Sequence, residues 1–481
     1  MRPFAPAGQL ATVLAVGAIF VATLAPPAGA AWSAPVTVSA PHSQIGGVQL
    51  VSGPGGEMLR WTSWDLMLPQ GIFGPPSTHY ALAPAGGAFG REQPLPASDA
   101  FNPIVNMGGG HLAHLLLTRT TKSTSTEKPE VALGATNGRF GSPLQIRGAT
   151  VGWGQPSLAG NARGALLLAW IALDAHQRRM VWASIRLPGG SFGRPQVIAA
   201  HAQAEQVSAA VGSNGDMVVT FPNKWGSLLA RVRRHGQQWG PLQSLGPAAG
   251  GNENDLTPFV TGSGNVLVAW YETQLCEGGC ADPGFTRVAV QPAGAPHFRR
   301  AQLLERDATG LVGSASGRSL APIVLSVGSQ APMVIFLARG APPPQGSALT
   351  PAVVRVASPR GLGFSAPQTI SPADEQAGEV AAAAGPSGAI VSWIRDEPPS
   401  YFGGSLFAAL RGTSGGFGAP EQVSPNEHVF TALPVFNLAS RWPGNSIAPW
   451  TLAWTSRPLS EASTVVRVSS PLCPDPACVG A

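Results

Sequence analysis

The feature that most constrains this chain is a short motif that recurs eight times along its length. The motif has an aromatic residue, a small residue, a proline and an aliphatic residue, as in WSAPVTV and FGRPQVI, and successive copies begin 47 to 66 residues apart. The proline shifts in two copies and is missing from one. The copies begin at Trp32, Phe89, Phe140, Phe192, Trp239, Phe298, Phe364 and Phe417. Self-similarity of this period predicts an array of similar units.

A second pattern fills the interval between successive motifs. An apolar strand runs through a turn into another strand that ends in an aromatic residue, as in PFVTGSGNVLVAW, which ends at Trp270. A third strand follows, and then the motif. Each unit therefore predicts four short strands, the content of one β-propeller blade. The 60 glycines and 47 prolines among 481 residues agree, since both disfavour helix interiors.

The number of units predicts how the ring closes. The first motif, at Trp32, has no three strands before it, and the last strand group, Thr431 to Leu472, has no motif after it. If the motif is the outer strand of a blade, the N-terminal copy completes the last blade and removes an open sheet edge. We therefore predict an all-β fold, a single β-propeller of eight four-stranded blades, with a seven-bladed ring as the alternative.

The N-terminus predicts an exported chain. Arg2 precedes an apolar stretch from Leu10 to Leu24, and Ala28-Gly29-Ala30 matches an A-x-A cleavage site. We expect residues 1–30 to be a signal peptide cleaved near Ala30, residues 31–472 to form the propeller and residues 473–481 to be a short C-terminal tail. No later stretch is long and apolar enough to cross a bilayer, so we expect no membrane span in the mature chain.

Four cysteines form two pairs that are close in sequence, Cys276 with Cys280 and Cys473 with Cys478. In an exported protein such pairs predict disulfides. Three connectivities are possible, and the short separations favour local pairing. The alternative is a zinc site made by all four thiolates, which would require the chain end to reach a loop about 195 residues upstream.

The glycine-rich turn and aromatic residue before each outer strand resemble the BNR or Asp-box repeats of sialidase-like propellers. The matching stretches are ATNGRFGSP, LPGGSFGRP and TSGGFGAP, and all lack the aspartate of the family motif. The resemblance implies a secreted bacterial propeller. Sialidases of this family hold the substrate carboxylate with three arginines, but no predicted inner strand here contains one. The resemblance therefore supports the fold and does not extend to catalytic residues.

Propeller ligands commonly meet the face built by two sets of loops, those between blades and those joining the second and third strands of a blade. No metal-ligand spacing or nucleophile motif identifies a catalytic centre there, so we expect no catalytic residue, no bound metal and no cofactor. Glu253 and Asp255 offer oxygens to a hard cation, but without EF-hand spacing. The candidate ligand-binding residues on this face are Trp64, Asp255, Tyr271, Glu272, Arg395 and Asp396.

Charge and composition narrow the function classes. The net charge is +5, but the basic residues form no stripe along the sequence, so we expect no nucleic-acid partner. Our leading hypothesis is a secreted, extracellular, monomeric and non-catalytic propeller that serves as a binding or scaffolding module for a protein or a glycan. The alternative is a cryptic sialidase-like glycoside hydrolase.

Overall fold

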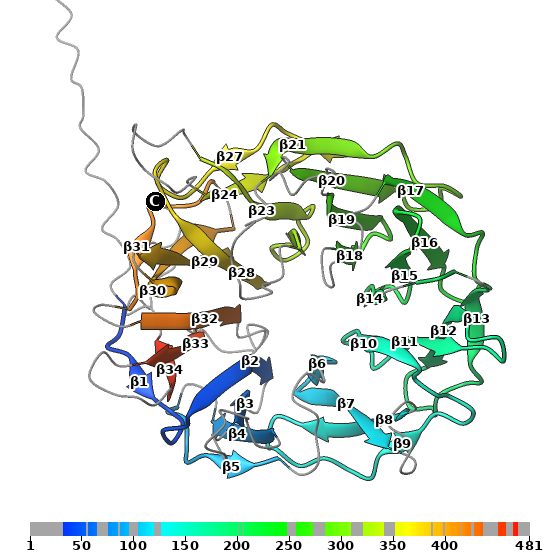
Figure 1. Ribbon diagram of the computed structural model, residues 1–481, viewed down its shortest axis with the longest axis horizontal. Helices are drawn as coiled ribbons and strands as arrows, with labels where there is room; N and C mark the ends of the chain where they lie inside the picture. Colours follow the sequence, from blue (N-terminus) through cyan, green and yellow to red (C-terminus); the bar gives the residue numbers. More distant parts are fainter. Residues whose placement is uncertain are drawn as a thin grey trace, which may run out of the picture.

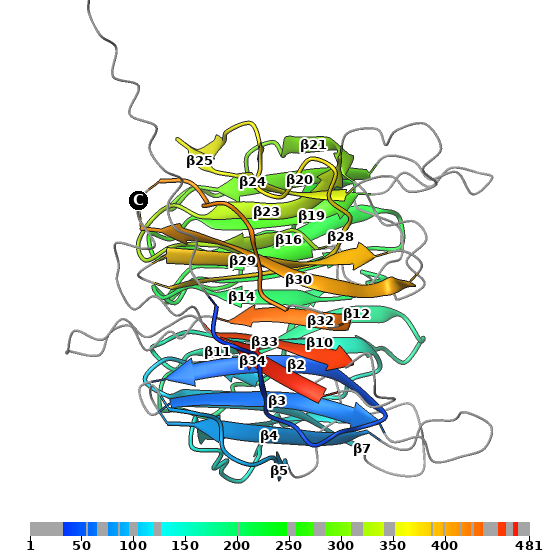
Figure 2. The same ribbon diagram turned by 90° about the vertical axis from the view of Figure 1, so that its left-hand side faces the viewer.

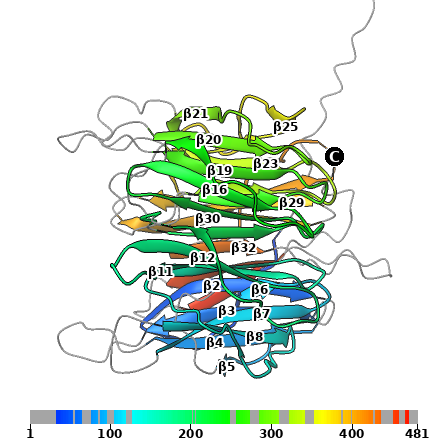
Figure 3. The ribbon, with the colours of Figure 1, turned by 90° about the vertical axis from the view of Figure 1, so that its right-hand side faces the viewer.

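The computed structural model is a ring of eight antiparallel four-stranded blades, with no helix among the described residues (Figure 1). Blades 7 and 8 are also joined through the pairing of β30 (Ser400–Gly412) with β32 (His428–Val435). Seen from its sides, the strands run from one face of the ring to the other (Figures 2 and 3). In the part of the chain that the structure describes, no helix is long and apolar enough to cross a membrane. The described residues are 32–53, 56–64, 76–84, 87–95, 104–119, 127–200, 202–204, 206–247, 256–272, 284–308, 321–340, 352–385, 388–397, 400–413, 415–424, 428–435, 451–457 and 465–469.

The first four blades each use four consecutive strands, ordered from the centre of the ring outward. They are blade 1, β2 (Gln44–Gly53), β3 (Gly56–Trp64), β4 (Ser77–Ala83) and β5 (Gln93–Pro94); blade 2, β6 (Ile104–Asn106), β7 (His111–Arg119), β8 (Glu127–Ala135) and β9 (Leu144–Gln145); blade 3, β10 (Trp153–Gly160), β11 (Leu166–Leu173), β12 (Arg179–Arg186) and β13 (Gln196–Ala199); and blade 4, β14 (Ser208–Val211), β15 (Met217–Pro222), β16 (Ser227–Arg233) and β17 (Gln243–Pro247).

The other four blades follow the same plan, with a small extra hairpin in blade 6 and a borrowed outer strand in blade 8. They are blade 5, β18 (Leu256–Val260), β19 (Val266–Glu272), β20 (Gly284–Gln291) and β21 (Gln302–Ala308); blade 6, β22 (Ile323–Leu325), β23 (Met333–Arg339), β24 (Ala352–Ala357) and β27 (Gln368–Thr369), with the hairpin β25 (Pro359–Arg360) and β26 (Gly363–Phe364); blade 7, β28 (Ala377–Gly385), β29 (Gly388–Glu397), β30 (Ser400–Gly412) and β31 (Glu421–Gln422); and blade 8, β32 (His428–Val435), β33 (Thr451–Arg457), β34 (Val465–Ser469) and β1 (Val36–Thr37).

The N-terminal strand closes the ring. β1 pairs antiparallel with β34, with Val36 opposite Val468 and Thr37 opposite Arg467. Its motif copy therefore supplies the fourth strand of blade 8, and the other seven copies contain the outer strands of blades 1 to 7. The prediction of eight blades with this closure is confirmed, and the seven-bladed alternative is wrong.

The recurrent aromatic residue of the second strand is the centre of the core. Trp61, Trp170, Trp270, Trp393 and Trp454 are fully buried. They pack across the joints between blades; Trp61 of blade 1, for example, belongs to one apolar cluster with three residues of blade 8, Ala453, Val466 and Val468. Burying so large an aromatic surface at each joint holds neighbouring sheets together. The prediction that these residues pack between blades is confirmed.

Candidate functional site

The candidate ligand-binding residues predicted from sequence lie on three blades that are not adjacent. Trp64 ends β3, Tyr271 and Glu272 end β19, and Arg395 is near the end of β29. Asp396 follows Arg395 on the same strand, but its side chain is not among those that the structure describes. Asp255 lies outside the described residues altogether. The four cysteines also lie outside the described residues. A ligand-binding role for the six residues, and the disulfides, therefore stay predictions.

Glu272, Tyr271 and Arg395 have contacts within the sheets that show how they are held. Glu272 forms an ion pair with Arg287 of β20, with 2.5 Å between Oε2 and Nε, and its side chain is 9% exposed. Tyr271 is buried against Gly284, where any added side chain would overlap its ring. These contacts hold the last residues of β19 against β20 in blade 5.

Arg395 joins two blades. Its Nη2 donates to Glu375 Oε2 at 2.8 Å, its Nε donates to the other carboxylate oxygen, and its guanidinium lies 4.0 Å from the centre of the Phe407 ring. The Glu375 side chain is fully buried, just before β28. A buried carboxylate needs such a partner because its desolvation is costly. Arg395 therefore holds the connection between blades 6 and 7 against β29.

A cavity lies on the opposite face of the ring from these residues. We call this the hairpin face, because it is made by the turns that join the first strand to the second and the third to the fourth in each blade. The cavity has a volume of about 1080 Å³, in the size range of small-molecule sites. Its lining comes from blades 4 to 7 and consists of Ser213, Phe259, Val260, Thr261, Gly262, Ser263, Asn265, Ser326, Val327, Gly328, Ser329, Gln330, Ala331, Pro332 and Thr413.

The lining is polar but neutral. Eight of the lining residues carry a hydroxyl or a carboxamide, and none of the described lining residues is ionisable. Hydroxyls and carboxamides both donate and accept hydrogen bonds. Ser213, Ser263 and Ser329 are exposed residues, and the Ser263 hydroxyl also lies 2.9 Å from Thr261 Oγ1. Polar side chains at the cavity can therefore hydrogen-bond a hydroxyl-rich ligand, and no described lining residue carries a carboxylate that could act as an acid or a base.

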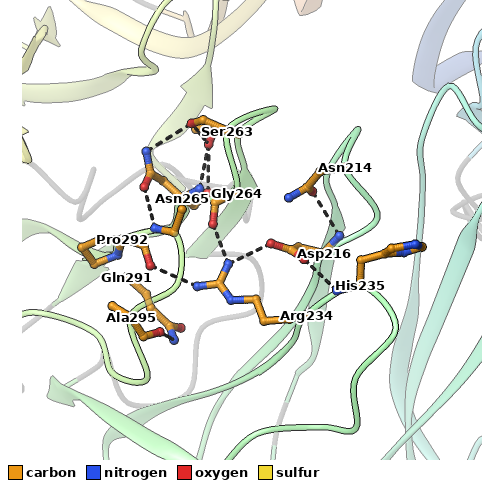
Figure 4. A network of polar contacts seen from close by, with 12 residues as sticks. Asn214, Asp216, Arg234, His235, Ser263, Gly264, Asn265, Gln291, Pro292 and Ala295 are labelled. Carbon is orange, nitrogen blue, oxygen red and sulfur yellow. Dashed lines mark hydrogen bonds and ion pairs between the residues drawn. The ribbon is translucent and has the colours of Figure 1, made fainter.

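A network of polar contacts builds the wall of the cavity on blades 4 and 5 (Figure 4). Arg234 is its centre: its Nη1 donates to Asp216 Oδ2 at 2.9 Å and to the Gly264 carbonyl at 2.5 Å, and its Nη2 donates to the Pro292 carbonyl at 3.1 Å. One guanidinium thus joins turns of both blades. Asn265 adds a further contact, since its Oδ1 accepts the Ala293 N–H at 2.8 Å. The turns are therefore held in place before any ligand arrives.

Blades 1 and 2 bury three ionisable groups away from this cavity. Burial raises the pKa of Glu57 to about 7, and a hydrogen bond from Thr451 acts in the opposite direction. Burial lowers the pKa of Arg60 to about 10. Burial and the nearby Arg60 charge lower the pKa of His114 to about 3, so this imidazole is neutral at physiological pH. None of the three belongs to the cavity lining.

One group of described side chains has the composition and convergence of a metal site. His42, His79 and Glu92 place their ligand atoms within 4.8 Å of one another. No motif in the sequence predicts this group, because the three residues are 37 and 13 positions apart and match no metal-binding spacing. The hairpin-face cavity was also missed. Its only signal in the sequence is the serine, threonine and asparagine content of the turns, which ordinary turn chemistry already explains.

Comparison with known proteins gives similarity at the level of solved structures only. No protein-family model matches the chain, and no curated protein matches its sequence. The solved structures to which it is similar include a lectin from Burkholderia pseudomallei (13% identity, TM-score 0.48, 81% of this chain and 100% of the lectin). They also include the β-propeller domain of the Trilobed protease from Pyrococcus furiosus (6% identity, TM-score 0.39, 77% and 97% of the two chains).

A third similar structure is a subtype N11 neuraminidase-like protein of A/flat-faced bat/Peru/033/2010 (9% identity, TM-score 0.35, 72% of this chain and 94% of that chain). At these identities and TM-scores the likenesses carry no argument about activity. The functional argument therefore rests on the chain's own residues.

Proposed function

We propose that this protein is a non-catalytic binding module that works outside the cell and holds a neutral glycan in the hairpin-face cavity. The observation that carries the proposal is the lining: eight hydroxyl or carboxamide side chains and no ionisable group among the described lining residues. Sugar hydroxyls are donors and acceptors at once, which suits serine, threonine, asparagine and glutamine partners. The export half of the proposal rests on the signal-like segment before Ala31.

The same lining argues against glycoside hydrolysis in this cavity. Most glycosidases need two carboxyl groups about 5 to 9.5 Å apart across the scissile bond. The described lining residues offer none, and the neighbouring Asp216 is held by Arg234 at 2.9 Å and by the His235 N–H at 2.8 Å. Asp216 is therefore occupied in holding the turns together. Binding without turnover is the activity that fits these residues.

A blocking substitution tests the site. Ser329 is exposed at the cavity, and Ser329→Trp would fill part of it; Ser191→Trp, on an exposed turn of blade 3 outside the lining, is the matched control. We would screen the mature chain on an array of neutral and sialylated glycans and measure the affinity of any ligand by calorimetry. We expect a neutral glycan to bind, Ser329→Trp to weaken it at least tenfold, and Ser191→Trp to leave it unchanged.

Two results would overturn the proposal. Equal affinity in both tryptophan variants would move the ligand away from the cavity. Release of product from an aryl-glycoside or a sialoside, lost in Asp396→Asn, would favour the sialidase-like hydrolase on the opposite face.

A further inference from the structure

Three side chains from separate parts of the chain meet where the closing strand passes into blade 1. His42 lies between β1 and β2, His79 is in β4, and Glu92 directly precedes β5. His79 Nδ1 is 2.7 Å and His42 Nε2 is 3.1 Å from the same oxygen, Glu92 Oε1. The side chains are only 12%, 15% and 16% exposed. Two imidazole nitrogens and one carboxylate oxygen therefore converge on one small, mostly enclosed space.

Two polar atoms of the cluster that do not face the shared space, one from Glu92 and one from His79, have hydrogen-bond partners of their own. Glu92 Oε2 accepts the Ala40 N–H at 2.7 Å, and His79 Nε2 lies 2.8 Å from Ser63 Oγ. The His79 ring also stacks on Trp61, with 6.0 Å between ring centres and 17° between planes. Metal-binding histidines and carboxylates are characteristically oriented in this way, by a hydrogen bond to the atom that faces away from the metal.

We propose that His42, His79 and Glu92 form a binding site for a divalent transition-metal ion of the zinc class. Imidazole and carboxylate ligands suit this class, and three protein ligands with a water in the fourth position is a common zinc arrangement. Ligands about 2.0–2.2 Å from zinc in a tetrahedron lie about 3.3–3.5 Å apart. The two distances to Glu92 Oε1, 2.7 and 3.1 Å, are slightly shorter, so these pairs need a few tenths of an ångström of outward movement to take the ion.

The ring nitrogens that face Glu92 can donate a hydrogen bond or bind a metal ion. Without metal, Glu92 Oε1 accepts the ring N–H groups of both histidines. When the ion binds, each ring carries its single proton on the other nitrogen, so that His42 Nε2 and His79 Nδ1 present lone pairs to the metal and the rings stay neutral. Ser63 serves His79 in both states, because a hydroxyl can donate to Nε2 or accept from it. The cluster therefore keeps its outer hydrogen bonds in either form.

The position of the site gives it a structural consequence. Residues 38–43, which we call the closing junction, connect β1 of blade 8 to β2 of blade 1. His42 belongs to the closing junction, and His79 and Glu92 belong to blade 1. A bound ion would cross-link the two and oppose detachment of β1 from β34, since a ligand that binds only the closed form stabilises it.

Zinc titration of the full mature chain tests the site. After removal of metal with a chelator, we would measure zinc binding by calorimetry and by elemental analysis of the dialysed protein. We expect one zinc per chain, a visible absorption band of tetrahedral type on Co²⁺ substitution, and a higher thermal unfolding midpoint with zinc. Glu92→Gln should weaken binding at least a hundredfold, and His176→Ala, at an exposed histidine of the β11–β12 turn, should leave it unchanged.

A second variant guards against simple misfolding. Ser63→Ala leaves all three ligands in place but removes the partner of His79 Nε2, and loss of such a partner typically costs 10- to 100-fold in metal affinity. Failure of the wild-type chain to bind zinc, or unchanged zinc affinity in Glu92→Gln, would overturn the proposal. Zinc that survives Glu92→Gln but is lost when the cysteines are alkylated would assign the metal to Cys276, Cys280, Cys473 and Cys478 instead.

Discussion

Removal of one hydroxyl at the ring closure, Ser39→Ala, should measurably destabilise the whole propeller. Ser39 Oγ accepts the backbone N–H of Val466 at 2.8 Å, and the Val38 N–H donates to the Val466 carbonyl at 2.9 Å. Ser39 is 6% exposed and Val466 is fully buried, so water cannot replace the lost acceptor. An unsatisfied buried donor costs about 1–3 kcal/mol, and alanine leaves almost no cavity. We expect a loss of ~2 kcal/mol, within that range.

The assay is urea unfolding followed by tryptophan fluorescence, with Ser191→Ala on an exposed turn as the matched control. Hydrogen exchange adds a local readout, because the amide of Val466 should lose protection in Ser39→Ala. Deletion of residues 32–39 should lower the midpoint further, since it also removes the pairing of Val36 with Val468. If Ser39→Ala unfolds at the same urea concentration as the control and the Val466 amide keeps its protection, the hydrogen bonds of Val38 and Ser39 to Val466 do not stabilise the closed ring.

Two other joints and one buried acid give further predictions. Arg395→Met should cost ~3 kcal/mol in urea unfolding, because it leaves the fully buried Glu375 carboxylate without its cation; full stability would show that the pair does not join blades 6 and 7. Glu57 is protonated in the folded chain up to its pKa of about 7 but ionises near 4.5 when unfolded, so its contribution is full below pH 4.5 and is lost as pH rises to about 7. At about 1.4 kcal/mol per unit this is ~3 kcal/mol, and Glu57→Gln should flatten the stability profile over that pH range; an unchanged slope would contradict the burial argument. Trp270→Phe should lower the free energy of unfolding by ~2 kcal/mol, because it loses side-chain volume and the hydrogen bond from Nε1 to the Pro247 carbonyl at 2.9 Å. An unchanged free energy of unfolding would show that Trp270 does not hold blades 4 and 5 together.

The fold was predictable because the residues that specify it repeat locally. Each outer strand carries its own copy of the aromatic-proline motif, and each second strand carries its own core aromatic such as Trp170 or Trp393. Even the closure by β1 follows from counting, because one motif copy lacks a blade and one blade lacks a motif. Local periodicity is sufficient for such a fold, since each unit contacts mainly its neighbours.

The sites were not predictable, because they depend on pairings between distant residues. From the sequence, Arg395 is predicted to be a charged loop residue that could contact a ligand. Its partner Glu375 is 20 positions away and is identified only in the folded structure, at the connection between blades 6 and 7. His42 and His79 meet through the closure of the ring, which no spacing rule describes. The hairpin-face cavity has no motif at all, since its serines and threonines are also common turn residues.

The distribution of charge connects the fold to the proposed function. Several of the few charged residues form ion pairs within the ring. These pairs are Arg234–Asp216, Arg287–Glu272, Arg355–Glu305 and Arg395–Glu375. Arg355–Glu305 crosses from blade 6 to blade 5, Arg395–Glu375 joins blade 7 to the segment that connects it with blade 6, and Arg234 reaches the turns of a second blade. With its charges placed at such joints, the ring presents hydroxyls and carboxamides at its cavity. Recognition there must therefore come from hydrogen bonds and shape, which favours a neutral, hydroxyl-rich ligand over an ionic one.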